Sequence, residues 1–135
     1  MRNSPEDVPP RYVIVESDRY ADDRDRAILS SNGRLGPEEA NTWYKRLLEA
    51  VNALTEFPGP LSHARDEDAS DFYGREVRRM LYYGPTRKRT GTPVRVLFTV
   101  LPPAEGEPPE TAEWVIFLLR LLRGAQTLAL EEDPA

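Results

Sequence analysis

The chain has 135 residues, 39% of them hydrophobic, and a formal net charge of -5, so we expect one domain with one core. It has no cysteine, which excludes disulfides, cysteine nucleophiles and thiolate metal sites. Its single histidine, His63, argues against a histidine-based zinc site, and no cofactor is expected. No apolar run reaches the roughly 18 residues that cross a bilayer, and the first residues lack the apolar segment of a signal peptide, so we expect a soluble cytoplasmic protein.

The N-terminal third predicts an arm, a strand and a helix. Residues 1–10 hold three prolines and several charges, which is typical of a loose arm. The β-branched run within 11–17 predicts a strand. Ser17 or Asp18 can cap a helix that follows, with Asn32-Gly33 at its end. The rest of that helix is densely charged, and we interpret its acidic pair Asp22-Asp23 as solvated surface, like Glu131-Glu132 near the C-terminus.

A second helix is the strongest prediction in the first half of the chain. It begins after Gly36, with Pro37 at its first position and two glutamates in its first turn, both favourable at a helix N-terminus. Apolar residues recur at spacings of three and four until Phe57-Pro58. The two helices should therefore form a hairpin. The apolar stripe consists of Ala40, Trp43, Tyr44, Leu47, Leu48, Val51 and Leu54.

The second half predicts a loop and three strands. Residues 61–74 are polar and acidic without a clear period, and we expect an exposed loop. Strands follow at 76–83, 94–101 and 114–122, separated by turns rich in glycine and proline. The predicted order is β-α-α-β-β-β, an α+β fold with all four strands in one sheet and the helical hairpin covering one face.

Side-chain alternation assigns the faces of these strands. Val94, Val96, Phe98 and Val100 should meet the hairpin, while Arg95 points to the other face. The last strand is apolar on both faces, which predicts either a buried central strand or an outer face that meets a partner. We favour the partner, with Trp114, Ile116 and Leu118 or their alternates at that face.

Residues 75–100 depart from the acidic character of the chain, because they hold seven basic residues and one acid. The overall acidity argues against general nucleic-acid affinity, but a local patch can supply positive potential. The alternative is that each arginine is solvated or paired with an acid of the preceding loop, such as Asp66, Glu67, Asp68 or Asp71.

Four strings in order resemble the RelE/ParE superfamily, the toxin halves of bacterial type II toxin-antitoxin pairs, and above all its ParE-like, plasmid-stabilisation branch. They are PEEANTWYKRLLEAVNALTEFP, EVRRMLYYG, VRVLFTV and LLRLLRGAQ. The resemblance covers residues 11–126 and leaves 127–135 as an acidic tail. It implies a small twisted antiparallel sheet packed on a helical hairpin, and a single domain.

The same resemblance implies a growth-inhibiting toxin that a cognate antitoxin neutralises, as a homodimer or a toxin-antitoxin hetero-oligomer without a membrane role. Its target would be DNA gyrase, poisoned by binding, or mRNA on the ribosome, cleaved by a metal-independent endoribonuclease. Arg95 stands at the arginine that RelE toxins place on the scissile phosphate, with Arg78 or Arg79 beside it. The closing motif has Arg123 and Gln126 where the family has histidine and arginine, which favours gyrase poisoning. A third possibility is an inert, repurposed member that only binds a protein.

The remaining candidates have simpler alternatives. Arg87, Lys88 and Arg89 could contact phosphate or a partner, or form a solubilising hairpin tip. Arg120 and Arg123 are further candidates for nucleic-acid or partner binding. One of Tyr82 and Tyr83 should point into the core, and the other is available as an acid or a stacking ring. His63 should be a solvent-facing side chain.

Overall fold

The computed structural model describes residues 10–83, 93–123, 126 and 128. The predicted arm at 1–9, the basic triplet at 87–89 and nearly all of the acidic tail lie outside these residues. The strands are β1 (Tyr12–Glu16), β2 (Arg78–Tyr82), β3 (Val94–Leu101) and β4 (Trp114–Leu122). The helices are α1 (Asp18–Leu35), α2 (Pro37–Asn52) and α3 (Glu67–Tyr73), with short 3-10 turns η2 (Ala53–Thr55) and η3 (Pro60–Ser62).

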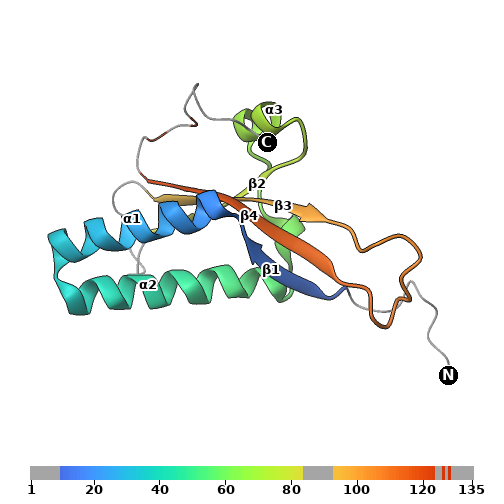
Figure 1. The fold of residues 1–135 in the computed structure, drawn as a ribbon, viewed down its shortest axis with the longest axis horizontal. Coiled ribbons are helices and arrows are strands. Elements are labelled where there is room, and N and C mark those ends of the chain that lie inside the picture. Colours follow the sequence, from blue (N-terminus) through green and yellow to red (C-terminus); the bar gives the residue numbers. More distant parts are fainter. Residues whose placement is uncertain (1–9, 84–92, 124–125, 127, 129–135) are drawn as a thin grey trace.

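All four strands share one sheet, as predicted, in the order β1-β4-β3-β2. The predicted antiparallel sheet is wrong, because β1 pairs in parallel with β4 while the other two pairs are antiparallel. Parallel neighbours need a long crossover connection, and the hairpin, β2 and β3 all intervene between β1 and β4. Figure 1 shows β1 and β4 side by side in this mixed sheet.

The helical hairpin covers one face of the sheet, as predicted (Figure 1). The Ser17 hydroxyl accepts a hydrogen bond from the Tyr20 N–H at 3.0 Å, which caps α1. Gly36 has φ 92°, a backbone conformation that favours glycine, and Pro37 then starts α2. The core of this face joins both helices to the sheet, and its buried members include Trp43, Leu47, Val51, Leu54, Val96, Phe98, Ile116 and Leu118.

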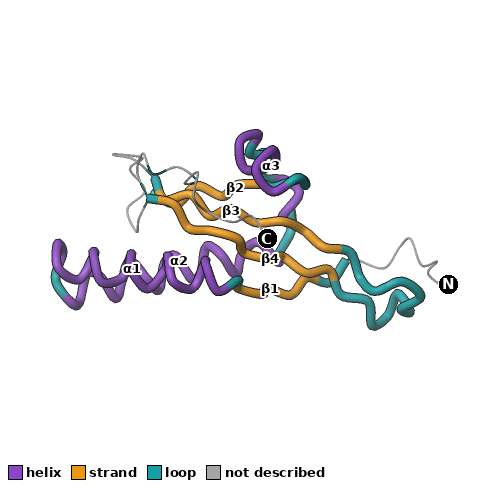
Figure 2. The backbone as a smooth tube through the Cα atoms, turned by 45° about the horizontal axis from the view of Figure 1, so that its top comes forward, coloured by secondary structure: helices purple, strands orange, loops and turns teal. Residues whose placement is uncertain are grey.

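The opposite face carries α3, within the segment predicted to be an exposed loop. That prediction is wrong, since Asp66 caps the helix by accepting from the Ala69 N–H at 2.9 Å, and Gly74, with φ 68°, ends it. Its seven residues make about two turns, too few to show a helical period in the sequence. Figure 2 shows α3 on the side of the sheet away from the hairpin. Its cluster comprises Ala69, Val77, Leu97, Leu119 and Leu122, with Tyr73, Phe117 and Leu128 packed against it.

Strand β4 is buried on both faces. Ile116 and Leu118 face the hairpin, and Leu119 and Leu122 belong to the α3 cluster. The predicted partner-binding outer face is therefore wrong for this strand, because its own chain covers it, and the alternative of a buried central strand is confirmed. Within the described ranges, no helix has the length and apolar character needed to span a bilayer.

Candidate functional site

The arginines of β2 and β3 do not form one cluster, because they point to opposite faces of the sheet. Arg78 pairs with Phe98, which faces the hairpin, and therefore lies on that side. Arg79 pairs with Leu97 of the α3 cluster and shares the second face with Arg95. Of the two neighbours predicted for Arg95, the structure brings only Arg79 beside it. A shift of one residue in register decides between the two, and sequence alone left that register open.

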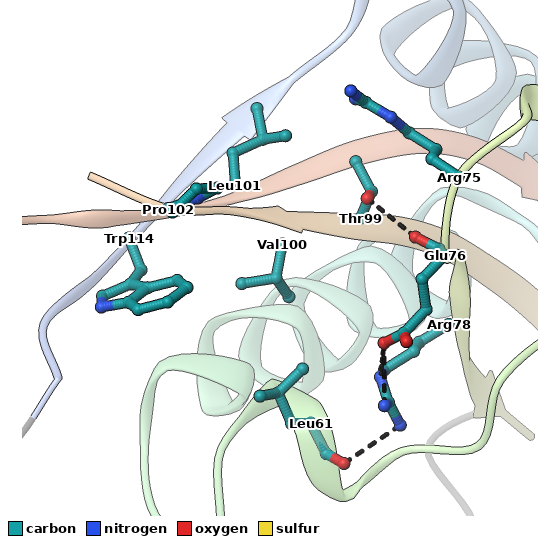
Figure 3. A pocket seen from close by; sticks show the side chains of 9 residues that line it. All are labelled: Leu61, Arg75, Glu76, Arg78, Thr99, Val100, Leu101, Pro102 and Trp114. Atoms are coloured by element: carbon teal, nitrogen blue, oxygen red, sulfur yellow. Dashed lines mark hydrogen bonds and ion pairs between the residues drawn. The ribbon is translucent and has the colours of Figure 1, made fainter. Parts of the chain in front are cut away.

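Arg78 holds the turn before α3 in place. Its Nε donates to Glu76 Oε1 at 2.9 Å, and its Nη2 lies 2.8 Å from the same oxygen. Its Nη1 donates to the carbonyls of Leu61 at 3.1 Å and His63 at 2.6 Å. Figure 3 shows the contacts with Glu76 and Leu61. All three guanidinium nitrogens thus have acceptors within the chain, which is the geometry of a structural arginine.

Asp66 lies between the two arginines of the second face. Its Oδ2 is 3.6 Å from Arg79 Nη1 and 4.0 Å from Arg95 Nη1, while its Oδ1 caps α3. Arg95 also donates to the carbonyl of Gln126. The Asp66 side chain is 8% exposed, whereas Arg79 and Arg95 remain 40% and 27% exposed. These two arginines are therefore anchored at one end and accessible to solvent at the other.

Arg120, a predicted binding residue, is in the core and does not reach the surface. It is 3% exposed, and its Nε donates to Asp23 Oδ2 at 2.6 Å while its Nη2 donates to Asp23 Oδ1 at 3.1 Å. The Leu121 N–H donates to the same carboxylate at 3.0 Å. Asp23 was predicted to be solvated, and it is 7% exposed. The signal was present, since Tyr20, Asp23 and Ala27 share one helical face, and the other two are apolar core residues.

The other predicted residues are scattered. Arg123 is exposed, and its backbone N–H donates to Gln126 Oε1 at 3.1 Å. Arg87, Lys88 and Arg89 lie outside the described residues. Basic side chains of the chain's second half thus occupy at least three separate environments: the hairpin face, the α3 face and the core.

The aromatic and histidine candidates belong to the hairpin face. Tyr82 is buried, and its hydroxyl donates to the Trp43 carbonyl at 3.1 Å; burial raises its pKa to about 12. This confirms that one of the two tyrosines points inward. His63 is half-buried against the Phe98 ring, and burial together with the nearby charge of Arg78 lowers its pKa. The prediction of a solvent-facing histidine is therefore wrong in part. Neither group lies on the face of Arg95, so neither is placed to act as an acid or base beside it.

In the described part of the chain, no three or more acidic or histidine side chains come together as a possible metal site. What the second face offers is a cationic surface with a carboxylate at its centre, suited to hydrogen bonding and charge pairing with a partner. Comparison with known proteins adds no relative, because no protein-family model, no curated protein and no solved structure matches the chain.

Proposed function

We propose that this chain acts by binding a protein partner, as a RelE/ParE-like toxin of the gyrase-poisoning kind that a cognate antitoxin holds inactive, and not by cleaving RNA. The four strings of sequence given above support the resemblance. The helical hairpin on one face of a four-stranded sheet is consistent with the fold that the resemblance implies. The mixed sheet and the helix α3 on the second face depart from that fold.

The observation that carries the choice of mechanism is the internal pairing of the arginines. Cleavage of RNA without a metal needs cations aimed at the phosphate, because negative charge builds up on it in the transition state. Arg78 faces away from Arg95 and has acceptors for all of its nitrogens. Arg79 and Arg95 share the carboxylate of Asp66, which repels a phosphate at that position. A protein partner can instead contact their exposed ends.

Helix α3 supports the same choice. It lies on the face to which Arg95 points, and Phe72 and Asp68 line a cavity of about 260 Å³ beside Arg95 and Leu97. An RNA strand on this face would meet two carboxylates, those of Asp66 and Asp68, at the edge of α3. Phosphate groups bind where positive charge is concentrated, and here it is partly neutralised.

Induced expression of the full chain in a bacterium tests the proposal, with growth, mRNA 5′ ends and plasmid supercoiling measured in parallel. We expect growth to stop with a change in supercoiling and without new mRNA ends. The variant Arg79→Ala with Arg95→Ala should weaken growth inhibition, while its melting temperature changes little, because exposed arginines contribute about 0–1 kcal/mol. Arg26→Ala on α1, an exposed arginine away from the sheet, is the matched control.

New mRNA ends that disappear in Arg95→Ala would overturn the binding mechanism and restore cleavage. Unchanged growth with soluble, folded protein would overturn toxicity and leave a repurposed binding module. Equal loss of inhibition in the Arg26→Ala control would remove the second face from the site. Each outcome is distinct because the three readouts are independent.

A further inference from the structure

Strand β2 is shorter than its neighbour β3, and its end leaves part of β3 without a partner. The pairing of β2 begins at Arg78, opposite Phe98, whereas β3 continues to Leu101. Beyond Phe98, the described residues pair with β3 only from the side of β4. Among the described residues, no strand pairs with the other side of residues 99–101. The chain approaches it at Glu76, whose carbonyl accepts a hydrogen bond from the Thr99 hydroxyl at 2.9 Å.

The hydrogen-bond pattern identifies which main-chain groups face this opening. The Arg79 N–H donates to Ala64, and the Val77 carbonyl accepts from Asp66, so residues 77 and 79 direct their polar groups away from β3. Arg78 must then exchange its main-chain bonds with Phe98, since direction alternates along a strand. Two residues further on, Val100 directs its N–H and C=O to the same side as Phe98. In the described part of the chain, no backbone group on this side hydrogen-bonds to Val100.

A cavity of about 270 Å³ adjoins this edge, and Figure 3 shows its lining. Leu61, Val100 and Trp114 lie on one side of β3, and Arg75 and Leu101 lie on the other (Figure 3). Leu61 is 53% exposed and Trp114 is half-buried, so the first side offers apolar contact. A volume at the lower limit of small-molecule pockets suits a short length of peptide.

Charge distinguishes the two sides. Arg78 also lines the cavity, but Glu76 neutralises it, and its nitrogens are engaged. Arg75 is exposed, and the described residues supply no acceptor for its guanidinium. Among the described residues that line the cavity, the cation without an internal acceptor therefore lies on the side of Leu101, opposite the apolar residues.

We propose that this edge binds an extended segment of a partner protein by strand addition to Val100, and that the segment alternates apolar residues with acidic ones. Successive side chains of an added strand point to opposite faces, so apolar ones meet Leu61 and Trp114 while carboxylates meet Arg75. Pro102 lacks an N–H and cannot extend the ladder as a donor. The paired stretch is short, and side chains must supply much of the affinity.

This inference goes beyond the proposed function, because it adds a second contact surface, on the β3 edge, to the α3 face that carries Arg79 and Arg95. It does not require the chain to be toxic. Growth inhibition tests the function, and peptide binding to the purified chain tests the edge, so the two can fail separately.

The experiment uses the purified full chain and a fluorescein-labelled peptide of alternating valine and aspartate, with fluorescence anisotropy as the readout. We expect saturable binding that Arg75→Glu weakens by about tenfold or more, as expected for reversal of a contacting charge. Methylation of alternate backbone nitrogens of the peptide should weaken binding to a similar degree, because it removes ladder donors without changing the protein. Hydrogen exchange of the Val100 amide should slow when the peptide binds.

Three controls keep the test specific. Arg26→Glu on α1 should leave the affinity unchanged. A peptide with lysine in place of aspartate should not bind. If Arg75→Glu has a lower melting temperature than the natural chain, Arg75→Gln takes its place. Absence of binding, insensitivity to backbone methylation, an unprotected Val100 amide or equal weakening by Arg26→Glu would each overturn the proposal.

Discussion

Two carboxylates pair with arginines from distant parts of this chain, and their contacts differ in burial and geometry. Asp23 and Arg120 connect α1 to β4 through two charge-assisted hydrogen bonds, with side chains 7% and 4% exposed. Asp66 connects the start of α3 to Arg79 and Arg95 at 3.6 and 4.0 Å, with both arginines open to solvent. The first contact is bidentate with both partners buried, whereas in the second the carboxylate is buried, the arginines are partly exposed and the distances are longer.

The difference separates structural from available charge. Desolvation makes each partner of a buried pair dependent on the other, because a lone charge in the core is costly. An exposed, loosely held arginine loses little when its internal acceptor is replaced by one on a partner. Identical residue types thus have opposite uses in the two regions, and only the second region is suited to binding.

Loss of one buried partner should have the largest effect. Asp23→Ala leaves the Arg120 guanidinium and the Leu121 N–H without this acceptor, and we expect a loss of about 3–5 kcal/mol in the free energy of unfolding. Urea denaturation followed by circular dichroism measures it. A loss below about 1 kcal/mol would mean that the core pair is no more structural than a surface pair.

Removal of both buried partners should cost less than removal of one. Asp23→Leu with Arg120→Met removes both charges of this pair, so we expect the loss of the Leu121 N–H acceptor to cost about 1–3 kcal/mol. The same denaturation series measures the coupling between the two sites. Additive losses in the double variant would show that the two side chains do not act as a pair.

At Asp66, loss of the helix cap should lower the free energy of unfolding more than loss of the charge does. Asp66→Ala removes the acceptor of the Ala69 N–H, and we expect a loss of about 1–2 kcal/mol. Asp66→Asn keeps a capping oxygen and removes the charge, and it should lose less than about 1 kcal/mol. If the asparagine variant is as unstable as the alanine variant, the contacts with Arg79 and Arg95 stabilise the fold after all.

The buried and exposed regions also differ in how well the sequence predicted them. Periodicity and capping residues predicted α2, β3 and β4, because long apolar patterns repeat there and Pro37 and Gly36 mark a helix start. The hairpin face followed from the alternation of β3, and the structure confirms it for Val96 and Phe98.

The features that were missed depend on tertiary contacts. Parallel pairing of β1 with β4 is decided by a crossover connection that leaves no local signal. Helix α3 is short and polar, and its apolar contacts with Leu97 and Leu122 come from strands far along the chain. For the candidate site, the sequence correctly assigned Arg78 and Arg79 to β2 and Arg95 to β3. Register between β2 and β3 then decided that Arg79, and not Arg78, lies beside Arg95.

The smallest expected effect concerns His63, whose environment couples the Arg78 contacts to pH. Burial against Phe98, and to a lesser degree the charge of Arg78, lowers the pKa of His63 in the folded chain below its ordinary 6.5. The unfolded chain therefore binds the proton more tightly, so stability is complete above pH 6.5 and is lost as pH falls toward the folded-state pKa. Between pH 7 and pH 5.5 the urea midpoint of the natural chain should fall, and that of His63→Gln should fall less. We expect the difference between the two chains to be smaller than the loss of stability caused by Asp66→Ala. Parallel profiles for the two chains would show that His63 titrates alike in the folded and unfolded states, and that its contact with Arg78 contributes nothing to the pH dependence of either region.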